Sequence, residues 1–127
     1  MISKLLFLFS LALSLIFAQR GCDPSWVAFR NNCYFVNKAH LNWTDAEAFC
    51  VSQEAHLASV HDFGENKLIS DLVRNSEPRS FINWLGGFSN DKNDKIYAWS
   101  DDSKWDFSLW APSHPYQYPC VAVSFVF

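Results

Sequence analysis

Four cysteines constrain what this short chain can fold into more than any other feature of its sequence. They stand at Cys22, Cys33, Cys50 and Cys120. None belongs to the close Cys/His pairs of a zinc site, so an even count indicates disulfides, and four cysteines allow three pairings. Residues 25–29 and 33–36 are aromatic and β-branched runs separated by residues 30–32, which predicts a hairpin with Cys22 and Cys33 at its two ends. We therefore expect a Cys22–Cys33 bridge, worth about 3 kcal/mol in the chain-entropy model.

The beginning of the chain has the pattern of a secretory signal peptide. Residues 1–4 are a short basic start, and residues 5–18 are an apolar run shorter than the about 20 residues that a membrane-spanning helix needs. A small residue, Ala18, offers a cleavage point before Gln19. We expect residues 1–18 to be removed and residues 19–127 to be a secreted, extracellular domain with no membrane span. A signal anchor that stays uncleaved is the alternative.

The charge balance and the absence of catalytic motifs argue against two classes of function. The chain has 10 Lys and Arg against 13 Asp and Glu, a formal net charge of −3, and no run of basic residues. Binding to the phosphate backbone of a nucleic acid is therefore not expected. The sequence contains neither G-x-S-x-G nor H-E-x-x-H, and its acidic residues fall in predicted caps, turns and loops. We expect a protein that is not an enzyme and does not bind nucleic acid.

The pattern of polar and apolar residues predicts a first helix after residue 43. Thr44 and Glu47 form a capping box that begins a helix of about ten residues. Ala46, Phe49 and Cys50 form its inner stripe, which points Cys50 toward the core.

A second helix and several strands complete a single α+β domain. The helix is predicted over residues 63–74, where it ends before Pro78. Strands are predicted over residues 81–85, stopped by Gly86-Gly87, over residues 97–99, and over residues 120–127.

An N-glycosylation acceptor stands at Asn42-Trp43-Thr44, just before the first predicted helix. A secreted chain would meet the enzyme that uses it. We expect a glycan on Asn42.

The histidines do not form a recognisable metal site. His56 and His61 are five residues apart, which fits neither one face of a helix nor a short chelate. We interpret them, with Asp62 and Glu65, as polar residues near a helix cap, and we expect no metal there.

Aromatic residues crowd the part of the chain from residue 99 to residue 118. They are Trp99, Trp105, Trp110, Tyr116 and Tyr118. Exposed aromatic rings stack on sugars or anchor protein partners. Rings in an irregular loop, here residues 105–119 with three prolines, also keep such a loop ordered. Both interpretations stay open.

The mature sequence resembles a C-type lectin-like domain of the long form, and the resemblance runs in order through almost all of it. The matching segments are residues 22–34, 49–50, 55–60, 65–66, 84–86, 97–101, 105–115 and 120–121. The resemblance implies two helices flanking a small antiparallel sheet, with a long irregular loop region that binds ligands.

The resemblance also implies where the ligand site departs from the family. Calcium-dependent members hold Ca²⁺ and sugar through Glu-Pro-Asn or Gln-Pro-Asp, since Ca²⁺ needs six to eight oxygen ligands. The aligned residues here are His114-Pro115-Tyr116, and Tyr118 replaces a further acidic ligand. We expect no cofactor, and binding without Ca²⁺. The candidate contacts are Trp105, His114, Tyr116 and Tyr118.

In relatives, Cys50 and Cys120 each pair with a cysteine beyond residue 127. The resemblance therefore implies that these two thiols are unpaired, or joined between molecules in a disulfide-linked dimer. It also implies a domain, residues 19–127, that lacks its last strands. The expected function is carbohydrate binding by a secreted C-type lectin-like protein. The alternatives are a domain that binds a protein surface, and a truncated product without a ligand.

Overall fold

The computed structural model describes residues 21–127 apart from residues 81, 91–95, 116–117 and 125–127. The predicted signal peptide, residues 1–18, lies outside the described residues. The chain divides into two compact units, Met1–Phe35 and Val36–Phe127.

The described part of the first unit is a disulfide-bonded hairpin. Strands β1 (Val27–Phe29) and β2 (Asn32–Tyr34) pair antiparallel. Arg30 in the turn has a φ of 52°, in the left-handed region that tight turns use. Cys22 and Cys33 are joined by a disulfide with their Cα atoms 5.6 Å apart. The hairpin and the bridge that the sequence predicts are both present.

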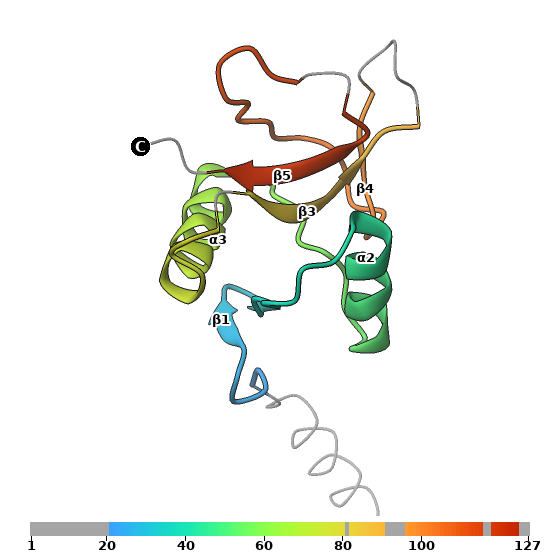
Figure 1. Ribbon diagram of the computed structural model, residues 1–127. Helices are drawn as coiled ribbons and strands as arrows, with labels where there is room; N and C mark the ends of the chain where they lie inside the picture. The colour runs from blue at the N-terminus through green and yellow to red at the C-terminus, as the bar shows by residue number, and fades with distance from the viewer. Residues whose placement is uncertain (1–20, 81, 91–95, 116–117, 125–127) are drawn as a thin grey trace, which may run out of the picture. The chain divides into compact units, whose positions relative to one another are not determined.

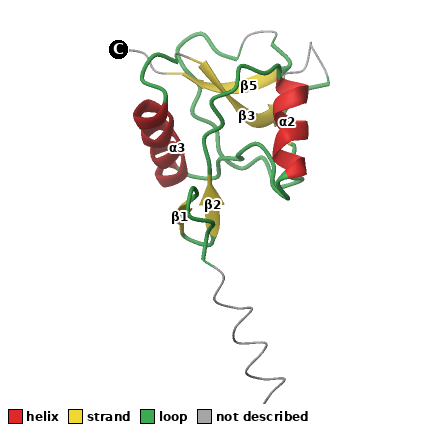
Figure 2. Cartoon of the chain, turned by 60° about the horizontal axis from the view of Figure 1, so that its bottom comes forward, coloured by secondary structure: helices red, strands yellow, loops and turns green. Residues whose placement is uncertain are grey.

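The second unit is built on a three-stranded antiparallel sheet. Its strands are β3 (Ile82–Phe88), β4 (Ala98–Trp99) and β5 (Cys120–Ser124), in the order β4-β3-β5. Figure 1 shows helices α2 and α3 on one side of this sheet and the chain of residues 105–115 on the other. Loops make up much of the unit (Figure 2). The expected α+β fold, with two helices and a small antiparallel sheet, is confirmed.

Strand β3 runs through Gly86 and Gly87, where the sequence predicted that it would stop. That prediction is wrong because these glycines allow close packing rather than a turn. A Cβ on Gly86 would lie 2.6 Å from the carbonyl oxygen of Leu57, and one on Gly87 would lie 2.6 Å from the Val121 side chain. Neither glycine has a positive φ. The strand continues because neighbouring chain segments press against it at these two positions.

Helix α2 (Trp43–Ser52) begins earlier than the capping box predicted. Its N-cap is Asn42, whose side chain accepts a hydrogen bond from the Asp45 backbone N–H at 2.9 Å. Thr44 lies inside the helix, so the Thr44/Glu47 capping box is wrong. Asn is as good an N-cap as Thr, and the choice depends on where the chain enters the helix. Glu47 is then free to bind elsewhere.

Helix α3 (Phe63–Ser76) begins at the residue predicted and extends two residues beyond the predicted end. Asp62 caps it and accepts from the Glu65 N–H at 3.0 Å. Ile69 and Val73, four residues apart on one face, are buried. They anchor the helix to the core, whose other buried apolar residues are Val60, Leu85, Trp99 and Val121.

Cys50 and Cys120 carry free thiols, and both are half-buried. Burial, and after it the negative charge of Glu47, raises the pKa of the Cys50 thiol. Burial also raises the pKa of the Cys120 thiol. Both groups are therefore thiols rather than reactive thiolates at neutral pH.

Candidate functional site

Four aromatic rings pack together where the loop after β4 crosses the sheet. We call Tyr97, Trp99, Trp105 and Trp110 the aromatic stack. Trp105 is its centre, with ring centroids 4.2 Å from Trp99, 5.5 Å from Tyr97 and 6.1 Å from Trp110. The interplanar angles of these three pairs are between 22° and 28°, which is the stacked arrangement. Rings from β4 and from the loop thus form one body.

The sheet packs against the aromatic stack and fixes its position. Trp99 is only 3% exposed. A Cβ on Gly87 of β3 would lie 3.1 Å from the Trp105 ring. The Trp105 Nε1–H donates to the Ser108 Oγ at 2.9 Å, which ties the ring to its own loop. Trp105 was a predicted ligand contact, and its surroundings give it a packing role.

Three residues with solvent exposure are called the aromatic shelf: Tyr97 and Trp110 of the stack, and Tyr118, whose backbone contacts Tyr97. Tyr97 and Trp110 are half-buried with centroids 5.2 Å apart, and Tyr118 is 68% exposed. The Tyr97 hydroxyl donates to the Tyr118 carbonyl at 3.2 Å. Burial raises the pKa of Tyr97, so its hydroxyl stays protonated and able to donate. The structure thus brings Tyr118 next to the stack.

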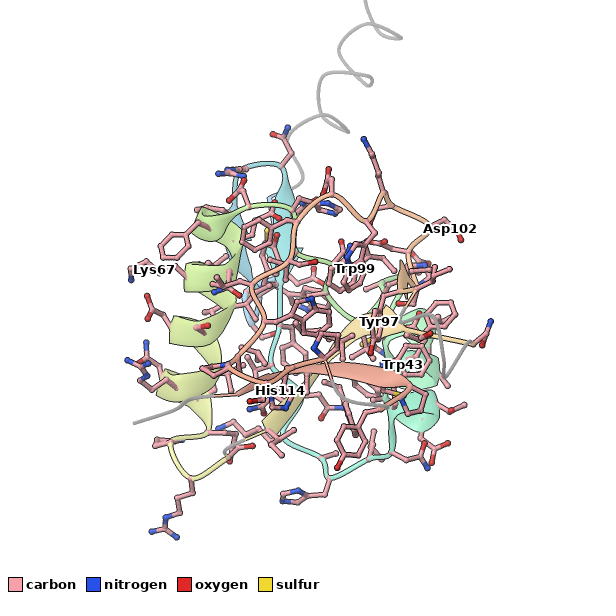
Figure 3. All side chains as sticks on the ribbon, turned by 90° about the horizontal axis from the view of Figure 1, so that it is seen from above. Trp43, Lys67, Tyr97, Trp99, Asp102 and His114 are labelled. Atoms are coloured by element: carbon pink, nitrogen blue, oxygen red, sulfur yellow. A yellow bond between two sulfur atoms is a disulfide. The ribbon has the colours of Figure 1, made fainter. Side chains whose placement is uncertain are left out.

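His114 lies apart from the aromatic shelf. In Figure 3, which is seen from above, His114 lies between α3 and the residues Tyr97 and Trp43. The His114 ring is exposed, and its Nδ1–H donates to the Pro112 carbonyl at 3.2 Å. The His114–Pro115 peptide bond is cis. Tyr116, the fourth predicted contact, lies outside the described residues.

The residues at this bend do not fit a calcium ion. An imidazole at His114 and a phenol at Tyr118 replace the oxygen-rich side chains that Ca²⁺ prefers. Among the residues that the structure describes, no group of three or more His, Cys, Asp or Glu side chains is arranged to hold a metal ion.

A second group of side chains lies under the start of the loop. We call Ser59, His61, Asp101 and Asp106 the clasp. Ser59 Oγ donates to Asp101 Oδ2 at 2.6 Å. His61 Nε2 lies 3.0 Å from Ser59 Oγ, and His61 Nδ1 lies 2.8 Å from Asp106 Oδ1. These bonds join residues 59–61 to residues 101–106 over more than 40 positions of sequence.

The clasp contains a serine, a histidine and an aspartate in hydrogen-bonded order, as in a hydrolase triad. It differs in the direction of the serine proton. In a triad the hydroxyl gives its proton to the histidine, whereas here the Asp101 carboxylate, 2.6 Å away, takes it. While the Ser59 hydroxyl donates to Asp101, His61 does not activate the Ser59 oxygen as a nucleophile.

The carboxylates of the clasp are stabilised in their charged form. Burial alone would raise the pKa of Asp101, but hydrogen bonds from Ser103 and Ser59 lower it below its usual value. The hydrogen bond from His61 is the main cause of the lowered pKa of Asp106. Both groups are therefore ionised at neutral and mildly acidic pH.

A separate network around Glu47 joins α2 to residues 56–57 and to Ser100, which follows β4. Glu47 Oε1 lies 2.6 Å from His56 Nδ1. Glu47 Oε2 accepts from the Leu57 N–H at 2.9 Å and from the Ser100 Oγ at 3.1 Å. Sequence reasoning missed both networks, because it treated the two histidines as polar residues near a cap. Their carboxylate partners are distant in sequence.

Asn42 is exposed at the start of α2. Its Nδ2, the atom that a glycan would modify, donates to Asp45 Oδ2 at 2.7 Å. Glycosylation there stays a prediction. No described helix is long and apolar enough to cross a membrane.

Comparisons with known proteins agree with the fold. The family model "Lectin C-type domain" matches residues 39–125. A protein named "Lectin" from Pleurodeles waltl is 32% identical over 111 residues, covering 83% of this chain and 64% of its own length. A "Galactose-specific lectin nattectin" from Thalassophryne nattereri is 28% identical, covering 77% of this chain and 61% of its own length. The chain thus spans less than two thirds of the length of these curated relatives.

Among solved structures, a calcium-independent type II antifreeze protein is similar to this chain with a TM-score of 0.72. The two are 27% identical, and the match covers 82% of this chain and 77% of the other.

Proposed function

Because this chain belongs to the C-type lectin domain family, we propose that it is a secreted protein that binds carbohydrate through the aromatic shelf without calcium. The single observation that carries the proposal is the shelf itself, in which Tyr97, Trp110 and Tyr118 present aromatic surface to solvent beside an ordered loop.

Aromatic rings suit a sugar because each pyranose has an apolar face of C–H groups. Such a face packs on an aromatic ring whose orientation is fixed. Stacking on Trp105 fixes the rings of Tyr97 and Trp110 in this way. The Tyr118 hydroxyl supplies a polar tip for sugar hydroxyls. The name of the Thalassophryne nattereri relative, a galactose-specific lectin, supports a sugar as the ligand class.

Independence from calcium is supported by the donor chemistry around the cis-proline. His114 and Tyr118 offer a nitrogen and a phenol where a calcium site needs carboxylate or carboxamide oxygens. The two clasp carboxylates nearest in sequence, Asp101 and Asp106, already bind Ser59 and His61.

A glycan array probed with the secreted protein, with and without EDTA, tests the proposal. We expect binding that EDTA leaves unchanged. Replacing Tyr118 with Ala should weaken it roughly fivefold, since one aromatic contact is worth about 1 kcal/mol. The matched control is Phe63→Ala, which removes a ring that is 64% exposed on α3 and should leave binding unchanged. Binding lost in EDTA would show that calcium is needed after all.

A protein surface is the second candidate ligand. It is favoured by Leu109, which is 58% exposed next to Trp110 and gives the shelf an apolar border. An array without any glycan signal, together with capture of a defined protein that Tyr118→Ala abolishes, would favour this candidate.

We also infer that the chain can form a disulfide-linked dimer. β5 has β3 as its one strand partner among the described strands, and the half-buried Cys120 begins it. An edge strand without charged residues pairs readily with another copy of itself. Non-reducing electrophoresis of Cys120→Ser and Cys50→Ser tests this: the first substitution should remove the dimer and the second should not.

Secretion and glycosylation belong to the same proposal. Residues 1–18 have the signal-peptide pattern, and the Cys22–Cys33 bridge fits an oxidising compartment. Expression of the full chain in animal cells should give medium protein that begins near Gln19, with a mass that falls after glycosidase treatment unless Asn42 is replaced by Gln.

A further inference from the structure

The clasp lies at the start of the loop that carries Trp105. Residues 101–106 follow β4 and include Trp105, the centre of the aromatic stack. Asp101 and Asp106 hold this segment at two points, through Ser59 and through His61. The position of the stack therefore depends on the hydrogen bonds of the clasp.

The protons of the clasp can be assigned from the acceptors. Ser59 has one hydroxyl proton, and it goes to the Asp101 carboxylate, which can only accept. The Ser59 oxygen must then accept from His61 Nε2, 3.0 Å away. The other ring nitrogen, Nδ1, faces the Asp106 carboxylate at 2.8 Å and must also donate. With both nitrogens donating, the His61 ring is an imidazolium cation.

We propose that His61 is a positioning residue whose doubly protonated form clasps residues 101–106 onto residues 59–61, so that the binding loop is held more firmly in mild acid than at alkaline pH. The effect on ligand binding rests on the proposed function, whereas the effect on the loop does not.

The charged groups around the ring are known from each neighbouring element. Asp101 and Asp106 face it from the segment after β4, and Lys104 lies close enough to act on Asp106. From the start of α3, the buried Glu65 carboxylate accepts from the His61 backbone N–H at 2.7 Å. The edge of the ring faces Trp99 of β4, with centroids 6.3 Å apart. Carboxylates outnumber the single lysine in this set.

Loss of one proton from His61 breaks one bond of the clasp. A neutral ring keeps a single N–H, which the Asp106 carboxylate takes. The other nitrogen can then only accept, so Ser59 must turn its proton toward it and leave Asp101, or the two lone pairs must face each other. In the first case residues 101–106 lose the attachment of Asp101 to Ser59, and in the second both attachments remain but are weakened by the repulsion between His61 Nε2 and Ser59 Oγ. Histidines titrate between about pH 5.5 and 8.

Amide hydrogen exchange of the free protein tests the clasp without any ligand. The Asp102 and Ser103 N–H groups report on the segment, because they donate to Trp99 O at 3.2 Å and to Asp101 Oδ1 at 3.0 Å. We expect their protection factors, which correct for the intrinsic effect of pH, to fall roughly tenfold from pH 5.5 to 8, as for loss of one hydrogen bond.

The discriminating variant is Asp106→Asn. An amide can donate to a neutral His61, which then uses its remaining N–H for Ser59, so every bond of the clasp is satisfied without a cation. We expect this variant to keep its protection at pH 8. His56→Gln is the matched control, since it removes the other carboxylate-paired histidine and should leave the fall intact.

The proposal is overturned if wild-type protection does not change with pH, or if Asp106→Asn loses as much as the wild type. Failure of the glycan array would remove the proposed function and leave this result standing. Where a glycan ligand is found, its dissociation constant should rise from pH 5.5 to 8 in the wild type and stay nearly constant in Asp106→Asn. His114, which lies on the loop itself, is present in both proteins, so it cannot cause a difference between them.

Discussion

The N-terminal hairpin and the loop of residues 105–115 are both small regions, yet different interactions order them. The hairpin is closed by a covalent bond between Cys22 and Cys33. Among the described residues, the loop contains no disulfide, and it is held by the stacking of Trp105 and Trp110 and by the clasp at its entry. A covalent closure acts mainly on the unfolded chain and does not titrate. A packed loop depends on many weak contacts, so it responds to substitution, pH and ligand.

The largest effect should follow removal of the ring at the centre of the loop. Trp105→Ala deletes a side chain that contacts three other aromatic rings, and should lower the free energy of unfolding by about 3–4 kcal/mol. Urea denaturation followed by circular dichroism measures it. A loss below about 1 kcal/mol would show that the stack is not what orders the loop.

Removal of the covalent closure should cost somewhat less. Replacing Cys22 and Cys33 together with Ser should lower stability by about 2–3 kcal/mol, because the bridge closes a short loop whose sequence separation is 11. Protection from amide hydrogen exchange should fall in β1 and β2 only. Equal loss of protection at Asp102 and Ser103 would contradict independent ordering of the two regions.

A smaller change tests how tightly the sheet supports the stack. Gly87→Ala adds a Cβ 2.6 Å from Val121 and 3.1 Å from the Trp105 ring. Overpacking of this kind costs about 1–3 kcal/mol, and tryptophan fluorescence should shift as Trp105 moves. Gly21→Ala is the control, because nothing lies within 4 Å of the added atom.

Acid should weaken the loop slightly and leave the hairpin unchanged. The lowered pKa values of Asp101 and Asp106 mean that their stabilising contribution is present above the unfolded pKa and is lost as pH falls through the folded one. Unfolding free energy should therefore decline below about pH 4. Because Asp106 is exposed and Asp101 is only partly buried, solvent screening should keep the decline small, and Asp101→Asn should reduce it. Protection in β1 and β2 that fell in parallel would contradict the distinction.

Local patterns in the sequence predicted most of the elements. The hairpin follows from two β-type runs around a turn, and the second helix follows from Ile69 and Val73 at helical spacing and from its end before Pro78. The errors occurred where one local signal had two meanings. Gly86 and Gly87 indicate a turn by composition, but here they serve close approach within a strand. Thr44 is a good cap, but Asn42 caps the helix.

The site was less predictable than the fold. The crowding of aromatic residues indicated a site near residues 99–118, and the resemblance added His114. Only the tertiary structure shows that the Trp105 ring is packed among other rings whereas the Tyr118 side chain is exposed. The clasp could not be predicted, because His61 and Asp106 are 45 residues apart and no local pattern joins them.

The sequence by itself determined the elements, the Cys22–Cys33 pairing and the membership in a family, because each of these rests on neighbouring residues or on an ordered series of motifs. The tertiary structure decided which aromatic rings are support and which are surface, where Glu47 binds, and which protons the clasp must hold. Those properties depend on distances between segments that meet only after folding, and on the number of donors and acceptors that each group then finds.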